Sequence, residues 1–171
     1  VTILAIDTLY RYSDEKQEKQ RTIRQMRSPS NTLAIDAVRI AQDEGWLWDG
    51  SLNQALLIGA NLAGASLQNA SLENANLAVA HLESAFLIGA NLKKIDLRGA
   101  NLEGAHLDEA NLQHANLTMA RLRGASLISA NLRGANLTNC GLQGAHLHHA
   151  DMRDAILYSA DLSYVFLEHT L

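Results

Sequence analysis

Histidine and glutamate side chains near the C-terminal end of the chain have the residue types and the spacing of a metal site. The interval from His148 to Glu168 equals the interval from His149 to His169. If this interval makes one coil of a stacked structure, each pair lies on adjacent coils, roughly 5 Å apart. Imidazole and carboxylate groups bind zinc at distances of about 2 Å. We predict no bound metal or cofactor and expect four exposed polar side chains; the alternative is a metal site, for which these four residues are the candidate ligands.

Motifs of enzymatic chemistry are absent from the sequence. It contains no His-Glu-x-x-His motif, no phosphate-binding glycine loop of standard spacing and no Gly-x-Ser-x-Gly turn. The single cysteine, Cys140, can form no internal disulfide, and we expect it to be a buried structural thiol. A net charge of −4 offers no basic surface for direct binding of nucleic acid. We therefore predict that the protein is not an enzyme.

A five-residue repeat positions these side chains. Leucine occupies every fifth position from Leu52 to Leu167, with Met152 as the single exception, which makes 24 consecutive pentads. Alanine lies two positions before each of them except at Gly50, Ile95, Cys140 and Val165. Five is neither the period of a helix nor that of a long strand, so each unit is a short extended segment plus a turn. Repeated turns of one hand wind the chain into a stacked solenoid.

Turn-forming residues fill the other positions of the pentad. The residue before leucine is often Asn or Asp, whose side chain bonds to nearby backbone in turns. The residue two after leucine is often glycine, which tolerates the positive φ of some tight turns. Proline is absent from the repeats, which is consistent with backbone N–H groups that bond to a neighbouring coil.

Runs such as Ala60-Asn61-Leu62 and Ala130-Asn131-Leu132 resemble the pentapeptide repeat family, and the resemblance covers residues 50–169. It implies an all-β solenoid: a right-handed quadrilateral parallel β-helix of about six coils, with four pentads in each coil. It also implies a bacterial protein, and long arrays of this kind are frequent in cyanobacteria.

Residues 1–49 differ in composition, so we expect an N-terminal helical segment before a β-helix of residues 50–171. Residues 13–27 are predicted to form a solvated helix. Residues 32–44 are predicted to form a second helix, with Ser30 or Asn31 as its N-cap.

The second helix is predicted to cover the first coil, because an open end of a β-helix exposes unpaired backbone that invites aggregation. The residues predicted to form this N-terminal cap are Leu33, Ala37, Ile40, Trp46 and Trp48. The rival interpretation is that this helix binds a partner.

The segment is also similar to family members with an N-terminal helical or membrane-attached part. The chain begins with Val1, and we expect a cytoplasmic protein, with membrane attachment through an upstream segment as the alternative.

Outward apolar residues are the candidate contact surfaces, because contiguous exposed apolar groups mark interactions. Phe86 and Ile88 can pack against a partner or beneath residues 1–30. The last pentads become more aromatic, and their candidate interaction residues are Tyr158, Tyr164, Phe166 and Leu171. Two interpretations stay open there: a final coil plugged by its own side chains, or a homodimer through this end, as in some family members.

The predicted function is a non-enzymatic structural or protein-interaction scaffold with an unknown protein partner. The alternative, which rests on the resemblance, is a DNA mimic that binds DNA gyrase. Mimicry needs a continuous acidic face, because duplex DNA carries dense negative charge. Glu83 and Glu103 share a column, but Arg123 follows them, and Lys93 follows Glu73 on another side. The acidic continuity therefore fails.

Overall fold

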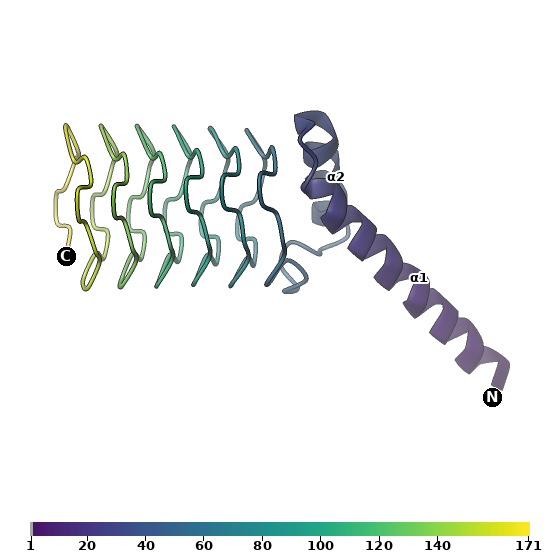
Figure 1. The fold of residues 1–171 in the computed structure, drawn as a ribbon. Helices are drawn as coiled ribbons and strands as arrows, with labels where there is room; N and C mark the ends of the chain where they lie inside the picture. The colour runs from purple at the N-terminus through teal and green to yellow at the C-terminus, as the bar shows by residue number, and fades with distance from the viewer. Residues whose placement is uncertain (1) are drawn as a thin grey trace.

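The computed structural model describes the backbone of residues 2–171 and the side chains of residues 11–171. Helix α1 spans Thr2–Met26 and helix α2 spans Asn31–Asp43. Helix α1 extends away from the repeats, and α2 lies beside the first coil (Figure 1). The predicted start of the first helix near residue 13 is wrong. The stretch before it contains neither glycine nor proline, so nothing in the sequence ends the helix there.

Within the described part of the chain, neither helix combines the length and the apolar character that crossing a bilayer requires. The second helix lies within one residue of its predicted bounds. Ser30 is its N-cap residue, as predicted, but the Ser30 side chain makes no capping hydrogen bond.

The pentads wind into coils of four. Parallel bridges join the residue before a leucine to the equivalent residue four pentads later, from the pair Leu56 and Asn76 to the pair His146 and Phe166. The 24 pentads therefore make six coils. At about 4.8 Å between coils the rod is roughly 29 Å long. The coils stack in register, with their corners aligned along the rod (Figure 1).

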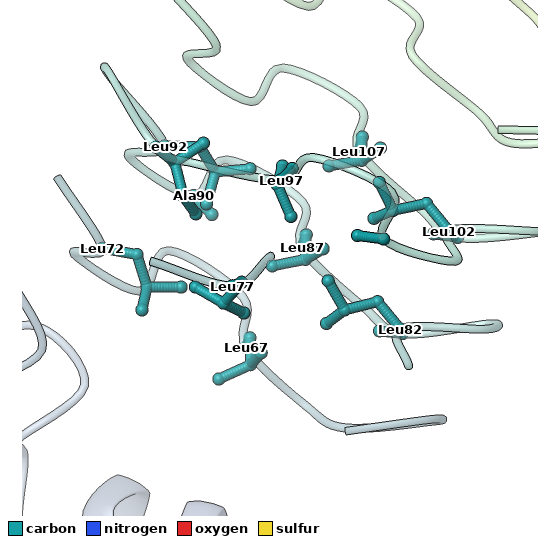
Figure 2. Packing of buried hydrophobic residues seen from close by; sticks show 14 of the residues in the cluster. Leu67, Leu72, Leu77, Leu82, Leu87, Ala90, Leu92, Leu97, Leu102 and Leu107 are labelled. Atoms are coloured by element: carbon teal, nitrogen blue, oxygen red, sulfur yellow. The ribbon is translucent and has the colours of Figure 1, made fainter. Parts of the chain in front are cut away.

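Leucine and alanine fill the interior of the rod. Every leucine of the series from Leu52 to Leu147 is at most 2% exposed. Equivalent leucines of adjacent coils lie over one another, as Leu67, Leu87 and Leu107 do in one column (Figure 2). Burial of each leucine contributes on the order of 1.5–3 kcal/mol. Because every side chain contacts only its own and adjacent coils, the stability of the rod is a sum of nearest-neighbour contacts.

A type II turn closes every pentad. In all 24 the N–H at the alanine position donates to the leucine carbonyl three residues before it, as Ala65 does to Leu62 at 3.0 Å. The residue two after leucine has a positive φ in every pentad, whereas the residue directly after leucine does not, which is the pattern of this turn type. Glycine fills only eight of these positions, and even the β-branched Val79 adopts φ 52° there. In the first five coils, the N–H groups of these residues donate to carbonyls of the next coil, as Val79 does to Arg98 at 2.8 Å.

Most backbone N–H groups within the rod are paired. Around Leu102, the N–H groups of Asn101, Leu102 and Gly104 all donate to carbonyls of neighbouring coils. The remaining N–H, of Glu103, donates to the side-chain oxygen of Asn101. Ten of the eleven Asn and Asp residues that precede leucine act in this way. The exception, Asn61, contacts the N-terminal segment instead.

Helix α2 packs on the rod through small side chains. Its buried residues belong to the same cluster as the leucines of the coils and are Ala34, Ala37, Val38 and Ala41. The prediction that Leu33 and Ile40 face the first coil is wrong, because they are 56% and 38% exposed. Short side chains let the helix approach the coil closely, and the two larger residues point outward.

Polar contacts attach the N-terminal segment to the first coil. The Asn31 side chain donates to the carbonyl oxygens of Asn61, at 3.2 Å, and of Ala63, at 3.0 Å. The Asn61 N–H donates to the Ser28 carbonyl at 3.2 Å. Asn31 therefore connects the helix to the rod by its side chain, which is a different role from the predicted N-cap.

The two tryptophans have different environments. Trp46 is buried against the rod, whereas Trp48 is half exposed and donates its indole N–H to the Gln68 carbonyl at 3.2 Å. The Lys19 ammonium lies 2.8 Å from the Asp49 carboxylate and 5.3 Å from the centre of the Trp46 ring. These contacts join α1 to the turn that enters the first coil.

Candidate interaction surface

One side of the rod gathers aromatic, aliphatic and histidine side chains. It is formed by the pentads of Leu67, Leu87, Leu107, Leu127, Leu147 and Leu167, and we call it the histidine face. Its first outward column, one residue before each leucine, contains Ser66, Phe86, His106, Ser126, His146 and Phe166. Its second column, one residue after each leucine, contains Gln68, Ile88, Asp108, Ile128, His148 and Glu168.

Aromatic rings on adjacent coils stack along the first column. The ring centroids of Phe86 and His106 are 4.9 Å apart, with planes 5° from parallel. Those of His146 and Phe166 are 4.6 Å apart, with planes 15° from parallel. These separations match the spacing of the coils, about 4.8 Å, and the range in which aromatic pairs attract one another.

The predicted interaction residues Phe86 and Ile88 point outward and are 37% and 38% exposed. The sequence left open whether residues 1–30 pack over them. In the structure α1 leads away from the rod (Figure 1), and no described part of the N-terminal segment buries them. The pair is therefore free for an external contact.

The C-terminal candidates also lie on the outside of the rod. Tyr158, Tyr164, Phe166 and Leu171 are all exposed. The inward residues Leu162 and Leu167 of this last coil are 38% and 48% exposed, although they continue the buried leucine series. The interpretation of a coil plugged by its own side chains is therefore wrong, because the larger side chains extend outward instead of across the interior.

The four candidate metal ligands form two separate pairs. His148 Nδ1 lies 3.8 Å from a Glu168 carboxylate oxygen, and the His149 and His169 rings stack with centroids 5.1 Å apart. Across the described residues, no group of three or more His, Cys, Asp or Glu side chains is placed to hold a metal ion. The shared columns were predicted correctly, but the side chains do not converge on one point.

Several charges of the rod form local ion pairs. Arg98 contacts Asp96 at 2.7 Å, and Arg153 contacts Asp151 at 2.6 Å. The hydrogen bond from Arg153 lowers the pKa of Asp151 to about 2. Arg121 pairs with Glu103, which interrupts the acidic column of that side. The histidine face differs, because its outward residues include carboxylates but neither lysine nor arginine.

Cys140 occupies a buried alanine position. Its thiol donates to the Ala120 carbonyl on the coil before it, at 3.2 Å, and burial raises the pKa of the thiol to about 12. The thiolate is therefore strongly disfavoured, and the residue is structural, as the sequence predicted.

Sequence reasoning identified the columns but missed the ring stacks. The stacks could have been predicted, because aromatic and histidine residues occur at equivalent positions of adjacent coils, at 86 and 106 and again at 146 and 166. It also missed the contact of Lys19 with Asp49 and Trp46, for which the sequence contains no comparable spacing.

Four-sided coils with inward leucine and a type II turn in every pentad define a pentapeptide-repeat solenoid. The model of the family described as pentapeptide repeats matches in eight copies, over residues 47–78, 77–109, 105–144 and 142–171. The chain therefore belongs to the pentapeptide repeat family, whose solved members form right-handed quadrilateral β-helices.

Two solved cyanobacterial proteins are similar to the chain. HetL from Nostoc sp. strain PCC 7120, involved in heterocyst differentiation regulation, shares 36% identity over 69% of this chain and 59% of its own, with a TM-score of 0.48. Rfr23 from Cyanothece 51142 shares 35% identity over 56% of this chain and 63% of its own, with a TM-score of 0.51. The chain thus spans about three fifths of the length of each.

A third solved structure is that of QnrB1, a plasmid-mediated fluoroquinolone resistance protein. It shares 18% identity over 68% of this chain and 65% of its own, with a TM-score of 0.42. That likeness carries no argument about function. No curated protein matches the chain significantly.

Proposed function

We propose that the protein is a non-enzymatic scaffold that binds a protein partner through the side of its rod. One observation supports this proposal most directly: the histidine face presents Phe86, Ile88, Ile128 and Phe166 outward in two adjacent columns. Exposed apolar groups that lie together on one face are typical of interaction sites. The interior of the rod is filled by its own leucine and alanine, so these outward residues are not needed to build the core.

The N-terminal segment has a second proposed role, as the cap of the rod. Burial of Ala37, Val38 and Trp46 supports this role, and so do the hydrogen bonds that Asn31 and Trp48 donate to carbonyls of the first coil. A cap of this kind protects the edge of a sheet from pairing with another chain.

Association of two copies through the last coil is a further proposal, which the exposure of Leu162 and Leu167 favours. Light scattering tests it: the mass of a dimer is expected at micromolar concentration, and a monomer at high concentration would contradict it. Gyrase binding by DNA mimicry has less support, because Arg121 and Arg123 interrupt the acidic column.

The scaffold function is tested by affinity capture from soluble and membrane extracts of the source cell. We expect one stoichiometric partner, which Phe86→Glu and Phe166→Glu lose. Leu56→Glu is the matched control, because Leu56 also points outward but lies on another side of the rod. Circular dichroism checks that all three variants fold. The absence of a partner from both extracts, or equal capture by all variants, would contradict a binding role of the histidine face.

A further inference from the structure

The ring stack of the histidine face is interrupted at its centre. Along the column the residues are Phe86, His106, Ser126, His146 and Phe166, an order that is symmetric about Ser126. Each histidine is stacked on its outer side by a phenylalanine. On the inner side the neighbouring coil presents only a serine, so a ring is missing between the two histidines.

The missing ring leaves room for one planar group. His106 and His146 are two coils apart, which places their side chains about 9.6 Å from each other. A ring at the level of Ser126 would lie roughly 4.8 Å from each imidazole, close to the separations of the two pairs that already stack. We call this gap, bounded by His106, Ser126 and His146, the Ser126 slot.

The base of the slot carries a hydrogen-bond acceptor. The Ser126 hydroxyl donates to Oδ1 of Asp108, and the same oxygen accepts the Ile128 N–H at 3.2 Å. The second carboxylate oxygen of Asp108 takes part in no hydrogen bond within the described residues. Beside the slot, Ile128 is 38% exposed, and His148 lies on the coil of His146. An occupant thus finds ring faces above and below, one aliphatic side chain at the side and an acceptor for an N–H or O–H group.

The charge of the surroundings narrows the class of occupant. The outward residues of the histidine face include the carboxylates of Asp108, Glu109 and Glu168 and neither lysine nor arginine. A nucleotide would bring its phosphate to a surface without a permanent cation, so charge disfavours it. An uncharged aromatic side chain with a donor, tryptophan or tyrosine, meets no such obstacle.

We propose that the Ser126 slot binds one tryptophan or tyrosine side chain of a protein partner, stacked between His106 and His146. This inference rests on the proposed scaffold function and specifies the kind of side chain by which the partner binds. Large aromatic residues that enter a pocket commonly dominate the energetics of protein interfaces.

Nuclear magnetic resonance of the imidazole Cε1–H protons tests the slot, with N-acetyl-L-tryptophanamide as the probe. We expect a saturable upfield shift of both the His106 and the His146 signals, because each proton then lies beneath an aromatic ring. The signals of His81 and His114, on other sides of the rod, remain unmoved.

Two matched variants separate the slot from the rest of the face. Ser126→Phe supplies the missing ring from the chain itself and is expected to abolish the shift. Ser66→Phe adds a ring to the same column outside the slot and is expected to keep it. His146→Ala removes one wall and should weaken the binding several-fold, which provides a second variant if Ser126→Phe does not fold.

Three results would overturn the inference: no saturable shift at either histidine, a shift that survives in Ser126→Phe, or stronger binding of adenosine monophosphate than of the tryptophan probe. The last result would assign the slot to nucleotides. The scaffold function is judged separately by the capture experiment. A partner that is lost in Phe86→Glu, while the probe gives no shift, would keep the scaffold and remove the slot.

Discussion

The two ends of the rod contain the same kind of pentad in different surroundings. At the first coil Leu57 and Leu62 are almost completely buried, whereas at the last coil Leu162 and Leu167 are about two fifths and one half exposed. The register and the turns are the same at both ends. What differs is the neighbour, because α2 and Trp46 lie against the first coil. The pentad thus determines the shape of a coil, but its burial depends on what stacks against it.

The backbone shows the same difference. At this end, carbonyls of the N-terminal segment accept the N–H groups of Asn61, in the first coil, and of Ser71, where the second coil begins, at 3.2 and 2.7 Å. At the last coil the N–H groups of Leu157, Leu162 and Leu167 meet no acceptor within residues 2–171. The N-terminal segment thus provides part of the hydrogen-bond acceptors that a preceding coil would provide.

The largest effect is expected in the middle of the rod, where both neighbours are coils. Leu112→Asp places a carboxylate at a fully buried position, which costs several kcal/mol and disrupts the contacts of both adjacent coils. Thermal melting followed by circular dichroism should show loss of the folded state or a large fall in Tm. The conservative Leu112→Met serves as the control. An unchanged Tm of Leu112→Asp would contradict the inward position of this residue.

At the covered end, Trp46→Ala is expected to lower the free energy of unfolding by about 3–5 kcal/mol, because it removes a large buried side chain from the contact with the rod. Trp48→Ala is the matched control. It loses one hydrogen bond and partial burial, so a loss of about 1 kcal/mol is expected. Urea denaturation measures both, and equal losses would show that Trp46 does not close this end.

A direct comparison of the two ends uses one substitution on the same side of the rod. Leu62→Ala should cost about 2–5 kcal/mol, as buried leucines do. Leu162→Ala lies in the same column but is partly exposed, and it should cost less than half as much. The free energies of unfolding from denaturant titration decide this prediction. Equal costs would mean that the last coil is covered in solution, for example by a second copy.

The smallest effect concerns acid stability at the last coil. The hydrogen bond from Arg153 lowers the folded pKa of Asp151 to about 2 from its ordinary 3.8. A lowered folded pKa stabilises the protein above the unfolded value, and this contribution is lost as the pH falls from 3.8 to about 2. Asp151→Asn should therefore flatten the pH dependence of stability in that window. Asp96→Asn, which removes the equivalent carboxylate of a central coil, is the comparison. A steeper pH dependence of stability in either variant would contradict the lowered pKa of the carboxylate that it removes.

The sequence predicted the rod well because each pentad repeats the same constraint. Inward Leu and Ala, the turns and the role of Asn and Asp before leucine could all be inferred from spacing and residue type. The four-sided coil could not be derived from the spacing, which says only that the chain turns once in every pentad. It came from the family resemblance and is confirmed by the bridges, each of which joins positions four pentads apart.

The N-terminal segment was harder to predict, for physical reasons. Helix α2 carries two overlapping apolar stripes, one with Leu33 and Ile40 and the other with Ala34 and Val38. Their periodicities are equally helical, and only the close approach to the coil selects the stripe of smaller residues. On the candidate site, the sequence placed Phe86 and Phe166 outward, but the stacked rings and the gap at Ser126 required the register between coils.

Hydrogen exchange resolved along the chain tests most directly the claim that a covering neighbour, rather than the pentad sequence, makes a coil rigid. We expect slow exchange of the backbone amides that bond between coils from Leu62 through the coil of Ser126, and rapid exchange at Leu162 and Leu167. The slot would then lie on a rigid part of the rod. Equal protection at the last coil and the first coil would contradict this account.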